Sequence, residues 1–159
     1  MTKTDTATFA AGCFWGVEEA FRILPGVLST RVGYTGGATE APTYEQVCTD
    51  QTGHAEAVEV TYDPAQVTYE TLLETFFANH NPTERNRQGP DVGSQYRSAV
   101  FVQSKEQRAA AEKAIEALTA ERRFARPIAT QVVDAAPFYP AEDYHQQYLL
   151  KRGLSSCHL

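Results

Sequence analysis

The feature that most constrains the fold of this chain is the order in which two apolar periodicities alternate along it. Apolar residues that recur at every second position, or run without interruption, predict strands at residues 7–12, 27–37, 55–63, 99–103 and 128–135. Apolar residues spaced at i, i+3 and i+4 predict helices at residues 17–24, 69–80 and 105–122. The predicted order is therefore β-α-β-β-α-β-α-β.

This order restricts the architecture, because every sheet face and every apolar helix stripe must be buried against another element. It favours an α+β fold of the broad α/β class, a two-layer sandwich of ferredoxin-like type with helices packed on a mixed sheet. The 159 residues suit one core, so residues 1–159 are predicted to form a single domain. From residue 137 onward the chain is aromatic and then polar without clear periodicity, which indicates an irregular C-terminal segment.

Composition argues against several classes of protein. The net charge is −6 and the basic residues are dispersed, whereas binding to nucleic acid needs a basic stripe that neutralises phosphates. No apolar run approaches the roughly 20 residues that span a bilayer, and residues 2–8 are polar, unlike a signal peptide. The odd number of three cysteines, without a signal peptide, argues against a disulfide framework, and their spacing includes no Cys-x-x-Cys pair of the kind found in zinc ribbons and thioredoxins. We expect a cytoplasmic protein that binds neither nucleic acid nor membranes.

Cys13 stands in the stretch "AAGCFWG", between the first predicted strand and the first predicted helix. A helix N-terminus offers free N–H groups and a partial positive charge, both of which stabilise a thiolate. Gly12 and Gly16 allow the backbone to turn tightly around the thiol. The pattern favours a nucleophile over the alternative, a small buried residue at a strand end.

Glu56 lies in "GHAEAVEV", two and four residues before Val58 and Val60. In a regular strand these three side chains point to the same face, which would bury the carboxyl group beside apolar residues. Burial favours the protonated form of a carboxyl group, so Glu56 is a candidate general acid. The alternative is that the strand begins after Glu56 and leaves the carboxylate in solvent.

Other candidates lie in polar segments. Tyr44 is predicted in the loop that follows residue 37, and Asp91 and Tyr96 lie in the Gly- and Pro-containing loop 79–98. A tyrosine hydroxyl in a pocket can donate a hydrogen bond to a substrate oxygen.

The remaining two cysteines differ in context. Cys157 lies in the tail 151–159, which has no apolar pattern and is predicted to be mobile. A mobile thiol suits a resolving role, in which it attacks an oxidised partner cysteine. Cys48 has no such context, and we interpret it as structural.

A zinc hydrolase is one alternative, because His54-Ala55-Glu56 matches the His-x-Glu of zinc deaminases. The Pro-Cys-x-x-Cys sequence that completes such a site is missing. Bound zinc in the purified protein would support this alternative.

A cysteine peptidase is a second alternative, because Cys13 is followed by an aromatic pair and by His145 at a compatible distance along the chain. The asparagine expected after that histidine is absent, although Asp143 is nearby. A non-enzymatic binding domain of ferredoxin-like type is a third alternative, which the clustering of unusual residues in loops disfavours.

Six segments in order resemble the A-type peptide methionine sulfoxide reductases. They are "GCFWGVEEAF", "VGYTGG", "PTYEQVC", "TGHAEAVEVTYDP", "FFANHNPTERNRQGPDVGSQYRS" and "FYPAEDYHQQYL", and the resemblance covers about Phe9 to Leu150. One departure is Asp50, where the family usually has glycine after the Cys-Thr or Cys-Ser pair. The single cysteine in the tail is another, because many members carry a longer, glycine-rich tail with one or two recycling cysteines.

The resemblance implies a reaction and a role for each candidate. The Cys13 thiolate would attack the sulfur of methionine sulfoxide, of the S epimer only, and Glu56 would donate the proton with which the oxygen leaves as water. Tyr44 and Tyr96 would hold the sulfoxide oxygen, and Asp91 would support the site through water or polar neighbours. Phe14 and Trp15 would form the apolar wall for the S-methyl group.

The resemblance also implies how the enzyme is recycled. The product is methionine plus a sulfenic acid on Cys13, which Cys157 would convert into a Cys13–Cys157 disulfide. Thioredoxin would reduce that disulfide, so the chain would repair oxidised proteins with no metal, flavin or nucleotide. We expect it to act as a monomer.

Overall fold

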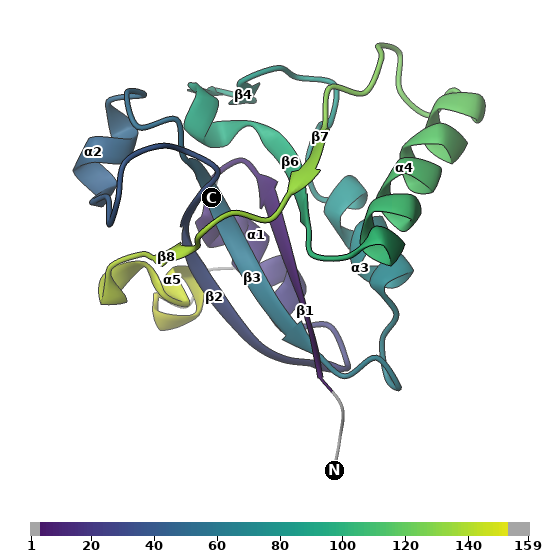
Figure 1. The fold of residues 1–159 in the computed structure, drawn as a ribbon, viewed down its shortest axis with the longest axis horizontal. Helices are drawn as coiled ribbons and strands as arrows, with labels where there is room; N and C mark the ends of the chain where they lie inside the picture. The colour runs from purple at the N-terminus through teal and green to yellow at the C-terminus, as the bar shows by residue number, and fades with distance from the viewer. Residues whose placement is uncertain (1–3, 153–159) are drawn as a thin grey trace.

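A mixed sheet organises the computed structural model, which describes residues 4–152 (Figure 1). Within these residues its strands follow the order β7-β6-β1-β3-β2-β8. The strands are β1 (Asp5–Ala11), β2 (Val27–Thr35), β3 (Ala55–Tyr62), β6 (Ser98–Val102), β7 (Gln131–Asp134) and β8 (Tyr139–Pro140). All neighbouring pairs are antiparallel except β6 and β7, which are parallel and make the sheet mixed.

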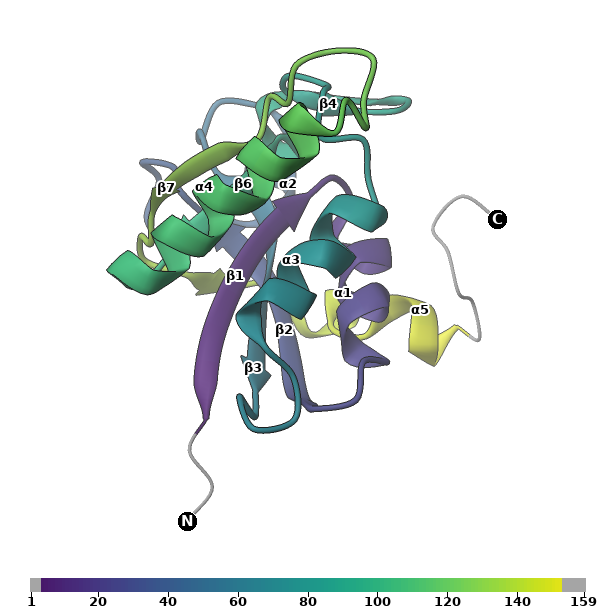
Figure 2. The same ribbon diagram turned by 90° about the vertical axis from the view of Figure 1, so that its right-hand side faces the viewer.

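The middle of the sheet has the ferredoxin-like topology that the sequence predicts. Strands β6-β1-β3-β2 are adjacent in that order, α1 (Phe14–Arg22) connects β1 to β2, and α3 (Tyr69–Ala78) connects β3 towards β6. After β6, α4 (Lys105–Ala120) leads back to β7. Figure 2 shows α1 and α3 on the same side of the sheet, and α4 packs on α3 and on the β6–β7 end.

The main core lies between the sheet and these helices. The ring of Phe9 on β1 stacks on Phe21 of α1, with 4.9 Å between centroids, and lies 5.3 Å from Phe76 of α3. The predicted apolar stripe of α3 is buried along its length and consists of Tyr69, Leu72, Leu73, Phe76 and Phe77. The α4 stripe is shallower, since Ala111 is its buried member and Ile115 and Leu118 are partly exposed. The periodicities therefore predicted the helices and the faces that they bury.

The segments predicted as loops contain short regular elements. The chain between β2 and β3 forms α2 (Tyr44–Cys48), so the prediction that Tyr44 lies in a loop was wrong. A capping box explains the helix: the Thr43 side chain accepts a hydrogen bond from the Gln46 N–H, and the Gln46 side chain accepts one from the Thr43 N–H. The segment 79–98 contains a hairpin of β4 (Arg87–Gln88) and β5 (Asp91–Val92), followed by the 3₁₀ turn η1 (Ser94–Tyr96).

The C-terminal segment packs against α1. It contains β8, the 3₁₀ turn η2 (Asp143–His145) and α5 (Tyr148–Lys151). The predicted tail 151–159 therefore begins inside a helix, and residues 153–159 lie outside the described residues. Every helix within residues 4–152 is too short or too polar to cross a membrane.

Candidate active site

Cys13 occupies the N-cap position of α1, at the end of β1, and is half-buried. The turn depends on Gly12, whose φ is +96° and where an added Cβ would lie 2.8 Å from the Gln88 side chain. A thiol at an N-cap is next to the positive end of the helix and its free N–H groups, which favour the thiolate. The predicted strand-to-helix corner is confirmed.

Glu56 lies inside β3, opposite Tyr34, and only 1% of its surface is exposed. Its Oε1 accepts a hydrogen bond of 3.3 Å from the backbone N–H of Phe14, the residue that follows Cys13. The strand is therefore regular at this point, and the alternative of a solvated carboxylate is wrong. The carboxyl group and the thiol meet at the same end of α1.

Tyr44 and Tyr96 come from different elements and both lie within electrostatic range of Glu56. Tyr44 begins α2 and Tyr96 ends η1, and both are half-buried. Burial raises the pKa of both hydroxyl groups well above the usual value, with further contributions from the hydrogen bond between Tyr44 and Cys48 and from the proximity of Glu56 to both tyrosines. Both therefore keep their protons at neutral pH and can donate hydrogen bonds to an oxygen atom.

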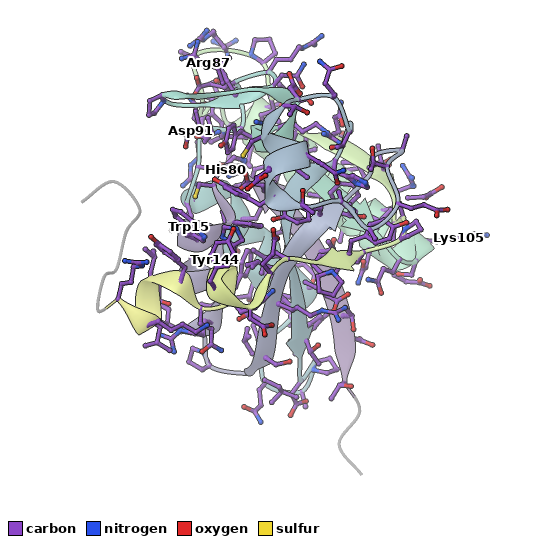
Figure 3. All side chains as sticks on the ribbon, turned by 90° about the vertical axis from the view of Figure 1, so that its left-hand side faces the viewer. Trp15, His80, Arg87, Asp91, Lys105 and Tyr144 are labelled. Atoms are coloured by element: carbon purple, nitrogen blue, oxygen red, sulfur yellow. The ribbon has the colours of Figure 1, made fainter. Side chains whose placement is uncertain are left out.

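Asp91 begins β5 in the hairpin beside η1 and is half-buried. Its charge, like that of Cys13, contributes to the raised pKa of Tyr96, after burial and the charges of Glu56 and Cys48. In Figure 3, Asp91 and Trp15 lie on the same side of the molecule. The structure therefore places Cys13, Glu56 and the hairpin within electrostatic range of one tyrosine.

The two aromatic residues after Cys13 differ in exposure. Phe14 is 1% exposed, and its ring lies 5.7 Å from that of Tyr34 and 6.5 Å from that of Tyr44. Trp15 is half-buried and stacks on Tyr148 with 3.8 Å between centroids. Trp15 is therefore partly exposed beside Tyr148, whereas Phe14 lies in the core.

The C-terminal segment holds these aromatic residues in place. Nδ1 of the buried His145 accepts a hydrogen bond of 2.9 Å from the Trp15 indole N–H. Glu142 accepts hydrogen bonds from the Tyr34 hydroxyl, at 2.9 Å, and from the Tyr44 backbone N–H, at 3.0 Å. Partial burial raises the pKa of Glu142, but these hydrogen bonds outweigh it and the pKa is lowered.

Glu18 anchors the same segment to α1. This buried carboxylate accepts hydrogen bonds from the Gln147 backbone N–H, at 2.6 Å, and from the Thr30 hydroxyl, at 2.8 Å. Sequence reasoning missed Glu18 and Glu142, because each depends on a partner about a hundred or more positions away. The one sequence feature that could have pointed to these two residues is that both lie in segments that carry the family resemblance.

The two other cysteines are in different situations. Cys48 ends α2, and partial burial raises the pKa of its thiol although the residue is largely exposed. A hydrogen bond joins its side chain to that of Tyr44, one turn earlier. Cys157 lies outside the described residues, so its pairing is a proposal.

The histidines required by the two hydrolase alternatives have other partners. Both ring nitrogens of His54 contact backbone atoms, Nδ1 the Gly37 N–H at 3.0 Å and Nε2 the Thr39 carbonyl at 2.6 Å. Residues 4–152 contain no group of three or more His, Cys, Asp or Glu side chains that could hold a metal ion. Nδ1 of His145 accepts the hydrogen bond from the Trp15 indole. This nitrogen is therefore not bound to the side chain that would orient the imidazole in a peptidase.

Comparisons with known proteins agree with this geometry. The family model of peptide methionine sulfoxide reductase matches residues 5–159. The peptide methionine sulfoxide reductase MsrA of Acidobacterium capsulatum is 59% identical over 153 residues, which cover 96% of this chain and 98% of the relative.

Two solved structures are also similar. Methionine sulfoxide reductase A of Corynebacterium diphtheriae superposes with a TM-score of 0.85 and 40% identity, covering 99% of this chain and 79% of that chain. Mxr1 of Saccharomyces cerevisiae in complex with Trx2 superposes with a TM-score of 0.64 and 26% identity, covering 92% and 85% of the two chains.

Proposed function

Because this chain belongs to the peptide methionine sulfoxide reductase family, we propose that it reduces the S epimer of methionine sulfoxide, free or in proteins, at Cys13. One observation carries the proposal: the buried carboxyl group of Glu56 binds the N–H of the residue next to Cys13, at the N-terminus of α1. A thiol nucleophile and a proton donor thus share one end of a helix.

The reaction transfers one oxygen atom and two electrons. The Cys13 thiolate attacks the sulfoxide sulfur while Glu56 protonates the oxygen, which leaves as water when the S–O bond breaks and a second proton reaches it. Water then attacks the Cys13 sulfur, breaks the S–S bond to the substrate, and releases methionine and a proton. The net products are methionine and a sulfenic acid on Cys13, so the substrate sulfur is reduced and the cysteine sulfur is oxidised. The raised pKa values of Tyr44 and Tyr96 support a role as neutral donors to the oxygen as it gains negative charge.

The S-methyl group of the substrate needs an apolar surface next to the thiol. Trp15 supplies it, because its ring is half-exposed and is fixed by stacking on Tyr148 and by the hydrogen bond to His145. Phe14 supports the wall from the core side, and Asp91 supports Tyr96 through nearby polar groups. Binding the methyl group and the oxygen on separate surfaces would select one epimer at sulfur.

Recycling requires a second thiol and an external reductant. The Cys157 thiol attacks the Cys13 sulfenic acid, which forms a Cys13–Cys157 disulfide and releases water. The dithiol of thioredoxin then reduces this disulfide and is itself oxidised, as the complex of the similar Mxr1 with Trx2 supports. In this scheme residues 1–159 act as one catalytic domain, a monomer with the resolving thiol in its tail. The transient disulfide suits a cytoplasmic location.

An assay of both epimers tests this proposal. The wild type with thioredoxin should consume the S epimer through many turnovers and leave the R epimer. Cys157→Ser should form roughly one methionine per enzyme and accumulate sulfenic acid on Cys13, because no thiol resolves it. Continued thioredoxin-dependent turnover by Cys157→Ser would assign the resolving role to another thiol, and reduction of the R epimer alone would refute the substrate assignment.

A further inference from the structure

Asp50 lies just after α2 in a backbone conformation that favours glycine. Its φ is +61°, in the left-handed region, where the Cβ of other residues is unfavourable. The side chain is exposed, so packing in the core does not explain the presence of Asp50 at this position. Its oxygen Oδ1 accepts two hydrogen bonds from Ser94, one from the backbone N–H at 3.1 Å and one from the hydroxyl group.

This contact joins the two segments that carry the site tyrosines. On one side, the Asp50 N–H donates a hydrogen bond of 3.0 Å to the Val47 carbonyl, which attaches Asp50 to the last turn of α2. On the other side, Ser94 is the first residue of η1, the turn that ends at Tyr96. We refer to the two hydrogen bonds between Asp50 and Ser94 as the α2–η1 clamp.

The clamp adds to the contacts that η1 makes with β3 and β4. The η1 turn is three residues long and follows a hairpin of two-residue strands. The Ser94 carbonyl also accepts a hydrogen bond of 2.9 Å from the Arg97 guanidinium. Burial lowers the pKa of Arg97, and the charge of Asp50 opposes that shift, so Asp50 also stabilises this cation. Ser94 is therefore held through its backbone and its hydroxyl group.

We propose that Asp50 is a positioning residue, which fixes the distance between the Tyr96 and Tyr44 hydroxyl groups by clamping Ser94 to the end of α2. The inference rests on the proposed function, in which both hydroxyl groups bind the sulfoxide oxygen. Two donors on separate segments can serve one oxygen only if those segments hold a fixed spacing, and small displacements of such groups reduce rates strongly.

Three substitutions separate the clamp from its effect on stability. Asp50→Gly removes the clamp and relaxes the left-handed backbone, so activity should fall while the melting temperature stays the same or rises. Asp50→Asn keeps an Oδ1 acceptor and tolerates positive φ, so it should restore most of the activity. Arg122→Gly is the matched control, because Arg122 has a similar φ of +52° and follows α4, across the molecule from α2 in Figure 1.

The measurements are kcat and KM for S-methionine sulfoxide under dithiothreitol and the NMR signal of ¹³Cζ-labelled Tyr96, assigned with Tyr96→Phe. We expect Asp50→Gly to lower kcat/KM about 5- to 30-fold, mainly through kcat, and to shift or broaden the Tyr96 signal. Asp50→Asn should lie within about threefold of the wild type, and Arg122→Gly should match it.

The outcomes distinguish this inference from the proposed function. An unchanged Tyr96 signal in Asp50→Gly, or an Asp50→Asn variant as slow as Asp50→Gly, would overturn the clamp. A shifted signal with an unchanged rate would show that the position of Tyr96 does not limit the reaction, and would also overturn the inference. None of these results bears on the assignment of Cys13 as the nucleophile, which Cys13→Ser tests separately.

Discussion

Replacement of Cys13 by serine is expected to abolish reduction of S-methionine sulfoxide. The serine hydroxyl group has nearly the same shape, but at neutral pH it is protonated and far less nucleophilic than a thiolate, even at the N-terminus of α1. The loss of kcat/KM should be about 10⁴-fold or more. The assay is the release of methionine under dithiothreitol, which removes any dependence on thioredoxin.

Cys48→Ser is the matched control for this variant. Cys48 is also a thiol within electrostatic range of Tyr96, and a serine there keeps a hydroxyl group that can hydrogen-bond with Tyr44. We expect this variant to retain most of the activity. If Cys13→Ser stayed active while Cys48→Ser lost activity, the nucleophile would have been assigned to the wrong end of the site.

Glu56→Gln is expected to produce the second-largest loss. Glutamine keeps the size of the side chain and an oxygen that can accept the Phe14 N–H, so the strand and the helix start should be preserved. The amide cannot donate a proton to the leaving oxygen. General acid catalysis is typically worth about 10²–10⁴-fold, and we expect kcat to fall by that factor with little change in KM.

The control for Glu56→Gln lies three residues along the same strand. Glu59 faces the opposite side of β3 and forms an ion pair of 2.9 Å with Arg31. Glu59→Gln makes the same replacement of a carboxyl group by an amide on the same strand but should leave the reaction rate unchanged. Equal rates for the two variants would mean that Glu56 orients the start of α1 and that the proton comes from elsewhere.

The parts of the site set by local periodicity were predictable from the sequence. Counting by twos from Val60 and Val58 placed Glu56 on the buried face of its strand, and the structure confirms this. The glycine before Cys13 and the apolar spacing after it predicted a strand-to-helix corner, which is also confirmed. Both predictions rest on interactions within a few residues, where strand and helix geometry leave little freedom.

The remaining features depend on contacts between distant parts of the chain. From the sequence Glu18 is an ordinary helix glutamate, whereas in the structure it is buried and accepts a hydrogen bond from the backbone N–H of Gln147, 129 positions later. From the sequence His145 is an isolated histidine, whereas in the structure its ring nitrogen accepts a hydrogen bond from the Trp15 indole, 130 positions earlier. The α2 helix is a different case, because the Thr43–Gln46 capping box was present in the sequence and was overlooked.

The central claim is that Cys13 receives the oxygen and passes its oxidation to Cys157. Mass spectrometry of the wild type tests it most directly, after reaction with one equivalent of S-methionine sulfoxide and alkylation of the remaining thiols. We predict one equivalent of methionine, a disulfide-linked peptide pair containing Cys13 and Cys157, and an alkylated Cys48. Alkylated Cys13 with the oxidation at Cys48, or methionine formed with all three thiols alkylated, would contradict it.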